Sequence, residues 1–263
     1  MADLEAQPVV VSKDEVNRSR RLIDPCEFVF KPLLGEFLGT LLLDFLASQL
    51  LVFAAQNFAL TAFCLAAVRY TLMLVLEDVC DGEFNPAITL SKLFCLQRNV
   101  FVSLALIAGQ FFGAFIGEIL FTVVCPSTTN VFPLNFINTT TIFEDRLPGS
   151  FQSYFLIEMI STLLFVIAFL RTEDCGCMAA VTLITTTIAF EAGLETRATG
   201  NFAQVFAHSI VGSLWQASDP WRYVEAAAAS TFVSPFIAAV LFWLLHSARE
   251  MKENDENDQQ PVV

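Results

Sequence analysis

The sequence predicts an all-α membrane protein in which six transmembrane helices and two re-entrant half-helices form an inverted 3+3 repeat. Composition gives the first indication, because 55% of the 263 residues are hydrophobic and only 16% are charged. The mean hydropathy of +0.61 is too high for an ordinary soluble domain. Six apolar runs, each close to the ~20 residues that cross a bilayer core, give the second. A motif shared by the first and fourth runs gives the third.

The six apolar runs divide the chain into two halves of three spans each. They cover residues 33–55, 58–76, 101–124, 151–170, 178–192 and 224–245. The fifth run is short, and we expect its helix to extend toward Thr196. Because each half has an odd number of spans, the two repeats must be inverted with respect to the membrane. Inverted repeats of this kind place the working site near the midplane between them.

The segments around these spans are expected to be tails, loops and half-helices. The expected divisions are a cytoplasmic N-terminal tail (1–32), a first repeat (33–124, half-helix 84–96), an extracytosolic loop (125–150), a second repeat (151–248, half-helix near 201–214) and an acidic cytoplasmic C-terminal tail (249–263). Most Lys and Arg residues then face the cytoplasm, as the positive-inside rule requires. The extracytosolic loop would carry the glycosylation sequon at Asn138.

The motif shared by the two repeats has the form Glu-x-x-small-Thr-Leu-Leu. It begins at Glu36 in the first span and at Glu158 in the fourth. A carboxylate inside the membrane is costly and needs partners within the helix bundle. We expect both to be structural buried acids that accept hydrogen bonds from irregular backbone, which is tolerated at this depth only where it is buried or lines a cavity. The alternative is direct contact with a substrate.

A short helix is predicted to begin at Asn85-Pro86-Ala87, directly after the second span. Asn is a good N-cap, Pro fits the first helical turn, and the apolar stretch that follows is too short to cross the membrane. We predict a half-helix that enters the bilayer from the cytoplasm and places the Asn85 amide and a partly positive helix N-terminus near the midplane. The alternative is a capped helix in a cytoplasmic loop.

Together these features resemble the aquaporin, or major intrinsic protein, family. The resemblance covers roughly residues 33–245 and rests on the runs 35–40, 62–66 and 82–89, on Gln110-x-x-Gly113-Ala114 and on Glu158-x-x-x-Thr162. It implies an aquaporin-like hourglass whose half-helices meet at two Asn-Pro-Ala motifs, assembled as a homotetramer with one pore per subunit. Asn85, Pro86 and Ala87 would then line the pore.

The second motif departs from the family pattern. In one register Asn201, Phe202 and Ala203 stand for Asn-Pro-Ala, and Gln204 occupies the position of the family's selectivity Arg. In the other, Thr199-Gly200 is fixed and Gln204 replaces the Asn. We favour the first because Asn and Ala both match and Asn201 can still cap a helix. One degraded motif resembles the superaquaporin, or unorthodox, branch, whose members often reside on intracellular membranes.

The expected selectivity filter consists of Phe63, which resembles the family's filter aromatic, and Gln204. Without the filter Arg, exclusion of cations would depend on the half-helix dipoles and the two Asn side chains. Arg69 in the second span is expected to pair with Asp44. The alternative is that Arg69 supplies the missing filter cation. His208 is expected to be a satisfied interior side chain rather than a pore group.

The sequence therefore favours a passive channel for water or small neutral solutes such as glycerol or hydrogen peroxide, in the plasma membrane or an intracellular membrane of the ER type. The main alternative, suggested by Phe202 and Gln204, is a structural or adhesion protein with the channel fold and a closed pore. A coupled secondary transporter is weaker still. We find no nucleophile–base pair, phosphate loop or metal-ligand spacing, so we expect no enzyme activity, catalytic residue, cofactor or metal site. Nucleic-acid binding is not expected either, because the sequence contains no basic cluster of the kind that binds nucleic acid.

Overall fold

The computed structural model describes residues 29–53, 58–124, 151–172, 200–214, 221 and 224–258. These residues form helices joined by turns, and no strand occurs among them. The helices are α2 (Lys31–Phe53), α3 (Phe58–Val75), α4 (Pro86–Phe94), α5 (Val100–Val124), α8 (Phe151–Thr172), α10 (Phe202–Leu214) and α11 (Val224–Asp258). Among them, α2, α5, α8 and α11 contain segments long and apolar enough to cross a membrane.

The observed helices agree closely with the predicted ones where the structure describes them. The first four predicted spans begin and end within two residues of α2, α3, α5 and α8, in that order. The two predicted half-helices agree equally well with α4 and α10. The fifth predicted span, the N-terminal tail and the loop with Asn138 lie outside the described residues.

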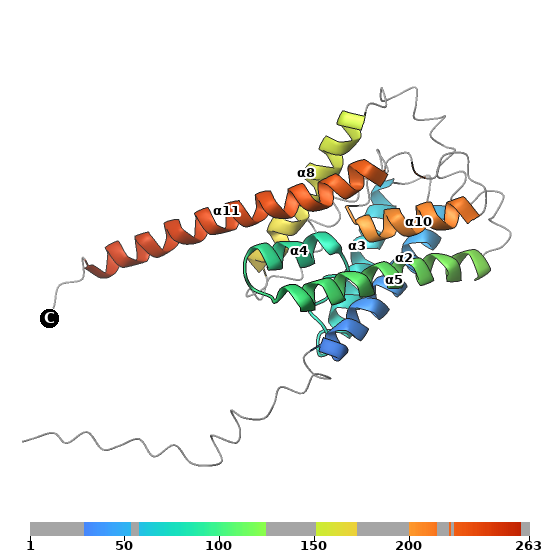
Figure 1. The fold of residues 1–263 in the computed structure, drawn as a ribbon, viewed down its shortest axis with the longest axis horizontal. Helices are drawn as coiled ribbons and strands as arrows, with labels where there is room; N and C mark the ends of the chain where they lie inside the picture. Colours follow the sequence, from blue (N-terminus) through green and yellow to red (C-terminus); the bar gives the residue numbers. More distant parts are fainter. Residues whose placement is uncertain are drawn as a thin grey trace, which may run out of the picture.

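The C-terminal boundary differs from the prediction. The last span was expected to end at residue 245 and an acidic tail to begin at 249, but α11 continues to Asp258 and extends well beyond the other helices (Figure 1). Residues 246–258 contain no Gly or Pro, and Ala, Arg, Glu, Met and Lys make up about half of them. These are strong helix formers, so local propensity continues the helix past the membrane span where charge alone suggested a tail.

Small residues allow α2 and α5 of the first repeat to pack closely. A Cβ atom added at Gly113 would lie 2.4 Å from the backbone oxygen of Phe37, and one added at Gly117 would lie 2.5 Å from that of Leu41. Glycines four residues apart lie on one face of a helix, and at these two positions no larger residue fits. In the second repeat α8 packs on α11, and Ser234 Oγ donates a hydrogen bond to the Met159 carbonyl at 2.9 Å.

Each half-helix packs mainly against long helices of the opposite repeat. The apolar face of α4 belongs to a buried cluster with α8 and α11, whose members include Ala87, Ile88, Phe165, Val166, Phe169 and Ala238. The equivalent face of α10 packs on α5, through Ala203 and Ala207 against Ala114 and Phe111. Since each repeat holds the half-helix of the other, the N-termini of α4 and α10 meet in the interior.

Candidate functional site

Each half-helix begins with an Asn that caps its first turn. Asn85 has extended backbone angles, and its Oδ1 accepts a hydrogen bond from the Ala87 backbone N at 2.9 Å. Asn201 does the same before α10, where its Oδ1 accepts from the Ala203 backbone N at 3.2 Å. Both side chains are nearly fully buried. The cap uses the amide oxygen of each Asn and leaves its NH₂ group to point away from the helix.

The NH₂ groups of these two residues connect the half-helices to each other. Asn85 Nδ2 donates to the carbonyl of Gly200 at 2.7 Å, and Asn201 Nδ2 donates to the carbonyl of Phe84 at 2.8 Å. The two bonds are reciprocal, because each runs to the residue that immediately precedes the other Asn. In the structure, therefore, Asn201 occupies the position in the second repeat that Asn85 occupies in the first, and Gln204 lies one turn further along α10.

The carboxylate of Glu36 holds the loop before α4. Its Oε1 accepts a hydrogen bond from the Glu83 backbone N at 2.8 Å, and its Oε2 accepts from the Phe84 backbone N at 2.7 Å. The Gln110 side chain adds a third bond to Oε2 at 2.8 Å and also donates to Thr89 at 2.9 Å. Glu36 thus satisfies two backbone N–H groups of an irregular loop, at a depth where an unsatisfied group would be costly.

Glu158 acts at the equivalent place in the second repeat. Its Oε1 accepts a hydrogen bond from the Gly200 backbone N at 3.0 Å. Gly200 has φ of 63°, and Phe84, its counterpart before Asn85, has φ of 46°. Positive φ is easy for Gly but strained for Phe, so the surrounding contacts must hold Phe84 in this conformation.

Arg69 contacts this same loop rather than Asp44, so the predicted Asp44–Arg69 pair is wrong. The guanidinium donates to the carbonyl of Glu83 and lies 4.6 Å from the ring centroid of Phe165. Asp44 lies two turns beyond Glu36 on α2, about 12 Å along the helix axis. Arg69 therefore lies level with Glu36, and Asp44 faces α5 and α10 instead. The contacts of Arg69 with this loop also do not support the alternative that it supplies a filter cation beside Gln204.

Two basic residues close the other end of the loop that leads into α4. Lys92 Nζ lies 2.9 Å from Asp81 Oδ2 and 3.2 Å from Glu83 Oε1. Arg98 contacts the same two carboxylates, with 2.6 Å to Glu83 Oε1. Burial alone would raise the pKa of Asp81, but Lys92 and then Arg98 lower it below its ordinary value. The four charges balance, and they join Asp81 and Glu83 to Lys92 in the last turn of α4 and to Arg98 beyond its end.

The comparisons with known proteins are consistent with this geometry. A family model described as major intrinsic protein matches residues 25–246. The chain belongs to the major intrinsic protein family. Its fold is similar to that in the X-ray structure of the aquaglyceroporin from Plasmodium falciparum, with a TM-score of 0.64 and 14% identity over 81% of this chain and 95% of that chain. Comparison with curated proteins finds no match. The predicted all-α membrane fold is confirmed, whereas the superaquaporin branch stays a prediction.

In this major intrinsic protein, Phe202 follows Asn201 as Pro86 follows Asn85, and α10 still begins directly after the capping Asn. The ring of Phe202 lies 5.4 Å from that of Phe111 and 5.8 Å from that of Phe206, in edge-to-face and tilted arrangements. These contacts point the side chain toward α5. Because Asn201 still caps α10, the helix can begin without Pro, and the aromatic contacts add stability of about 0.5–1.5 kcal/mol per pair.

The two residues predicted for the filter lie in different environments. Gln204 is only 4% exposed, and its amide approaches Asp44. Phe63, on α3, is 50% exposed. The structure gives no contact between the two, and the fifth predicted span is outside the described residues.

Sequence reasoning assigned no contact to two polar residues of α5 that matter for the site. Gln110 connects Glu36 to Thr89, and Glu118 contacts His208 of α10. Glu118 could have been singled out, because any acid in the middle of an apolar span indicates a buried partner. Its partner could not have been identified, since His208 lies 90 residues further along the chain.

Proposed function

We propose that this chain is a passive channel for water or small neutral solutes, such as glycerol or hydrogen peroxide. The observation that carries this proposal is the reciprocal pair formed by Asn85 and Asn201 at the facing N-termini of α4 and α10. Membership of the major intrinsic protein family and the similarity in fold to an aquaglyceroporin support it. No covalent chemistry is required, because the site needs only to replace the hydrogen bonds that a solute makes with water.

The two motif residues would provide those replacement hydrogen bonds. An amide NH₂ carries two N–H donors, and the bond to Gly200 uses one of the two on Asn85. We infer that a solute in single file accepts from the motif amides while the apolar walls set the width of the path. Pro86, Ala87 and Ala203 would complete the wall at this level, whereas the ring of Phe202 packs against Phe111 of α5. Two helix N-termini that face the path carry partial positive charge, which opposes the passage of cations and protons.

The proposed filter is neutral. Phe63 and Gln204 would form it, with Gln204 in place of the cation that other family members use. A neutral amide donates and accepts hydrogen bonds but does not repel cations by charge. The exclusion of cations would therefore depend more strongly on the Asn pair and the two helix dipoles than it does in a channel with a filter Arg.

Flux measurements on the purified full-length protein in liposomes test this proposal. We expect water, glycerol or hydrogen peroxide to cross faster than in empty vesicles. Asn85→Asp should lower neutral-solute flux about tenfold, the effect of losing one hydrogen bond of ~1.4 kcal/mol, and raise cation leak because it places negative charge at the centre. Phe101→Ala, at an 82% exposed position on α5, serves as the control and should behave as the wild type. Flux equal to that of empty vesicles for all three solutes would contradict the proposal.

A second candidate function is a structural or adhesion role with a closed pore. The tight burial of Asn85, Asn201 and Gln204, each at most 4% exposed, favours it. The packing of Phe202 against Phe111 counts against it, because this bulky ring is held against α5. The same flux measurements distinguish the two functions, since a closed pore conducts none of the solutes in either the wild type or the variants.

We also propose that the protein forms a homotetramer with both termini in the cytoplasm, in the plasma membrane or an ER-type membrane. Tetramers are what the family resemblance implies, and the distribution of Lys and Arg supports the orientation. Native mass measurement in mild detergent tests the assembly. Glycan attachment at Asn138 in cells would support an extracytosolic 125–150 loop, whereas protease cleavage of both ends from the outside would contradict the orientation.

A further inference from the structure

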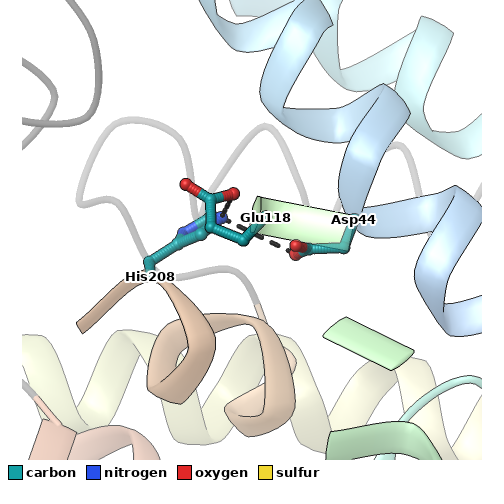
Figure 2. Close-up of side chains that lie close together, drawn as sticks. All are labelled: Asp44, Glu118 and His208. Atoms are coloured by element: carbon teal, nitrogen blue, oxygen red, sulfur yellow. Dashed lines mark ion pairs between the residues drawn. The ribbon is translucent and has the colours of Figure 1, made fainter. Parts of the chain in front are cut away.

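Three titratable side chains from three helices meet in the interior on the side of α10 that faces α2 and α5. They are Asp44 of α2, Glu118 of α5 and His208 of α10 (Figure 2). His208 Nε2 lies 3.0 Å from Glu118 Oε2 and 3.6 Å from Asp44 Oδ1. One ligand atom from each residue lies within 4.8 Å of the other two. The hydroxyl of Ser48 also lies close, 3.3 Å from His208 Nε2.

The carboxylates in this cluster have more acceptor capacity than the described residues satisfy. Both oxygens of Asp44 and Oε1 of Glu118 are buried and receive no hydrogen bond of normal geometry from a described residue. The Gln204 amide approaches Asp44, and Ser48 donates to Glu118 Oε2 at 2.8 Å. Asp44 and Glu118 are both 0% exposed. Carboxylates buried to this extent are costly unless they are fully paired or bind a metal ion.

The equivalent position in the first repeat shows what the cluster lacks. His208 follows Asn201 by seven residues, and Lys92 follows Asn85 by seven. Lys92, together with Arg98, balances the two carboxylates of Asp81 and Glu83. At the second position two carboxylates face one imidazole, and within the described part of the chain no Lys or Arg side chain contacts them. The second cluster is thus the more negative of the two, although it is the more deeply buried.

We propose that Asp44, Glu118 and His208 bind a divalent transition-metal ion, and that Zn²⁺ is the ion that fits best. Zn²⁺ takes imidazole nitrogen at ~2.0–2.1 Å and carboxylate oxygen at ~2.0–2.2 Å, which places tetrahedral ligand atoms about 3.4 Å apart. The two His-to-carboxylate distances, 3.0 and 3.6 Å, lie on either side of that value. Ca²⁺ and Mg²⁺ are less suitable because they require six or more oxygen ligands. Ser48 or a water molecule would complete the fourth position.

The position of the cluster assigns the ion a structural role. His208 lies two turns from Asn201, about 10 Å along the axis of α10, so the ion would not contact a solute at the Asn pair. It would instead join α10 to α2 and α5. This function is independent of solute transport, because a chain without flux can still bind the ion.

Metal analysis and thermal unfolding of the purified full-length protein test this inference. After treatment with a chelator and dialysis against Zn²⁺, we expect one Zn²⁺ per chain and a higher unfolding temperature than in the chelator. Mutation of a residue that only supports a metal ligand typically weakens metal binding 10–100-fold, and removal of a ligand itself should weaken it at least as much. Asp44→Asn and His208→Asn should therefore lose the ion. Asp81→Asn, which removes an acid beside the equivalent position of the first repeat, should retain it.

A cysteine variant keeps the test decisive even where His208→Asn fails to fold. His208→Cys preserves a good zinc ligand, so it should bind one ion, and with Co²⁺ it should show a sulfur-to-metal charge-transfer band that the wild type lacks. Substoichiometric Zn²⁺ in the folded wild type would overturn the inference. So would equal binding by wild type and a folded Asp44→Asn variant, or a His208→Cys variant that binds Co²⁺ without that band.

Discussion

The ring of Phe84 fills the space that a side chain at residue 39 would occupy. A Cβ added at Gly39 of α2 would lie 1.9 Å from Cε1 of this ring. Phe84 is 0% exposed and has φ of 46°, a conformation that costs a non-glycine residue about 1–3 kcal/mol. The contact with Gly39 thus contributes to holding the strained residue whose carbonyl accepts the hydrogen bond from Asn201.

We predict that Gly39→Ala lowers the stability of the protein by about 1–3 kcal/mol, the usual cost of inserting atoms into a packed interior. Thermal unfolding in detergent measures the effect. In a Phe84→Ala background the same substitution should cost much less, since the ring that it meets is gone. Equal costs in both backgrounds would show that the Gly39–Phe84 contact does not limit packing here.

The glycines of α5 should differ in their tolerance of Ala. At Gly113 the new Cβ would lie 2.4 Å from the backbone oxygen of Phe37, whereas at Gly109 its closest neighbour is the terminal Cδ1 of Leu33, at 2.6 Å. A side-chain end can rotate away but a helix backbone cannot. We expect Gly113→Ala to destabilise by about 2 kcal/mol and Gly109→Ala by less than about 1 kcal/mol. Unfolding temperatures of the two single variants, compared side by side, check the order, and the reverse order would contradict it.

Substitution of the two repeated carboxylates, Glu36 and Glu158, should lower the stability of the protein by different amounts. Glu36 accepts three hydrogen bonds from described residues, and Glu158 accepts one, from Gly200. In a Gln variant an NH₂ group replaces one carboxylate oxygen. In Glu36→Gln this donor would face the backbone N–H of Glu83 or Phe84, which is also a donor. We expect Glu36→Gln to cost about 2–3 kcal/mol and Glu158→Gln about 1 kcal/mol. Thermal unfolding and yield of monodisperse protein measure both, and a larger loss for Glu158→Gln would refute this interpretation.

Local sequence was sufficient to predict the features that depend on local chemistry. Asn85 and Asn201 are recognisable as caps from the residues around them, and the shared Glu-x-x-small-Thr motif places Glu36 and Glu158 at equivalent points. The repeat then relates the two loops, because a device found in one half is expected in the other. This is how the sequence predicts that Asn201 has a role despite the loss of Pro.

Contacts between helices could not be predicted in the same way. Whether Asp44 faces Arg69 or His208 depends on the rotation and height of three helices, which the sequence pattern does not determine. Glu118 comes from a third helix, and no metal-ligand spacing in the sequence indicates that it meets Asp44 and His208. The extension of α11 to Asp258 depends on local helix propensity, whereas the charged residues of this segment predicted a tail.

Acid should weaken the closure of the loop before α4. The pKa of Asp81 lies below its ordinary value because Lys92 and Arg98 more than offset the effect of burial. A pKa that is lower in the folded state than the unfolded value of ~3.9 means that ionised Asp81 stabilises the fold above about pH 4, and that this stabilisation is lost as the pH falls toward the folded-state value. The unfolding temperature of Asp81→Asn should therefore lie below that of the wild type at pH 6, and the two should converge as the pH falls below about 4. The Asp81 side chain is 52% exposed, so 1 M salt should also narrow the gap at pH 6. A gap that stays constant from pH 6 to pH 3 would show that Asp81 stabilises the loop without its charge.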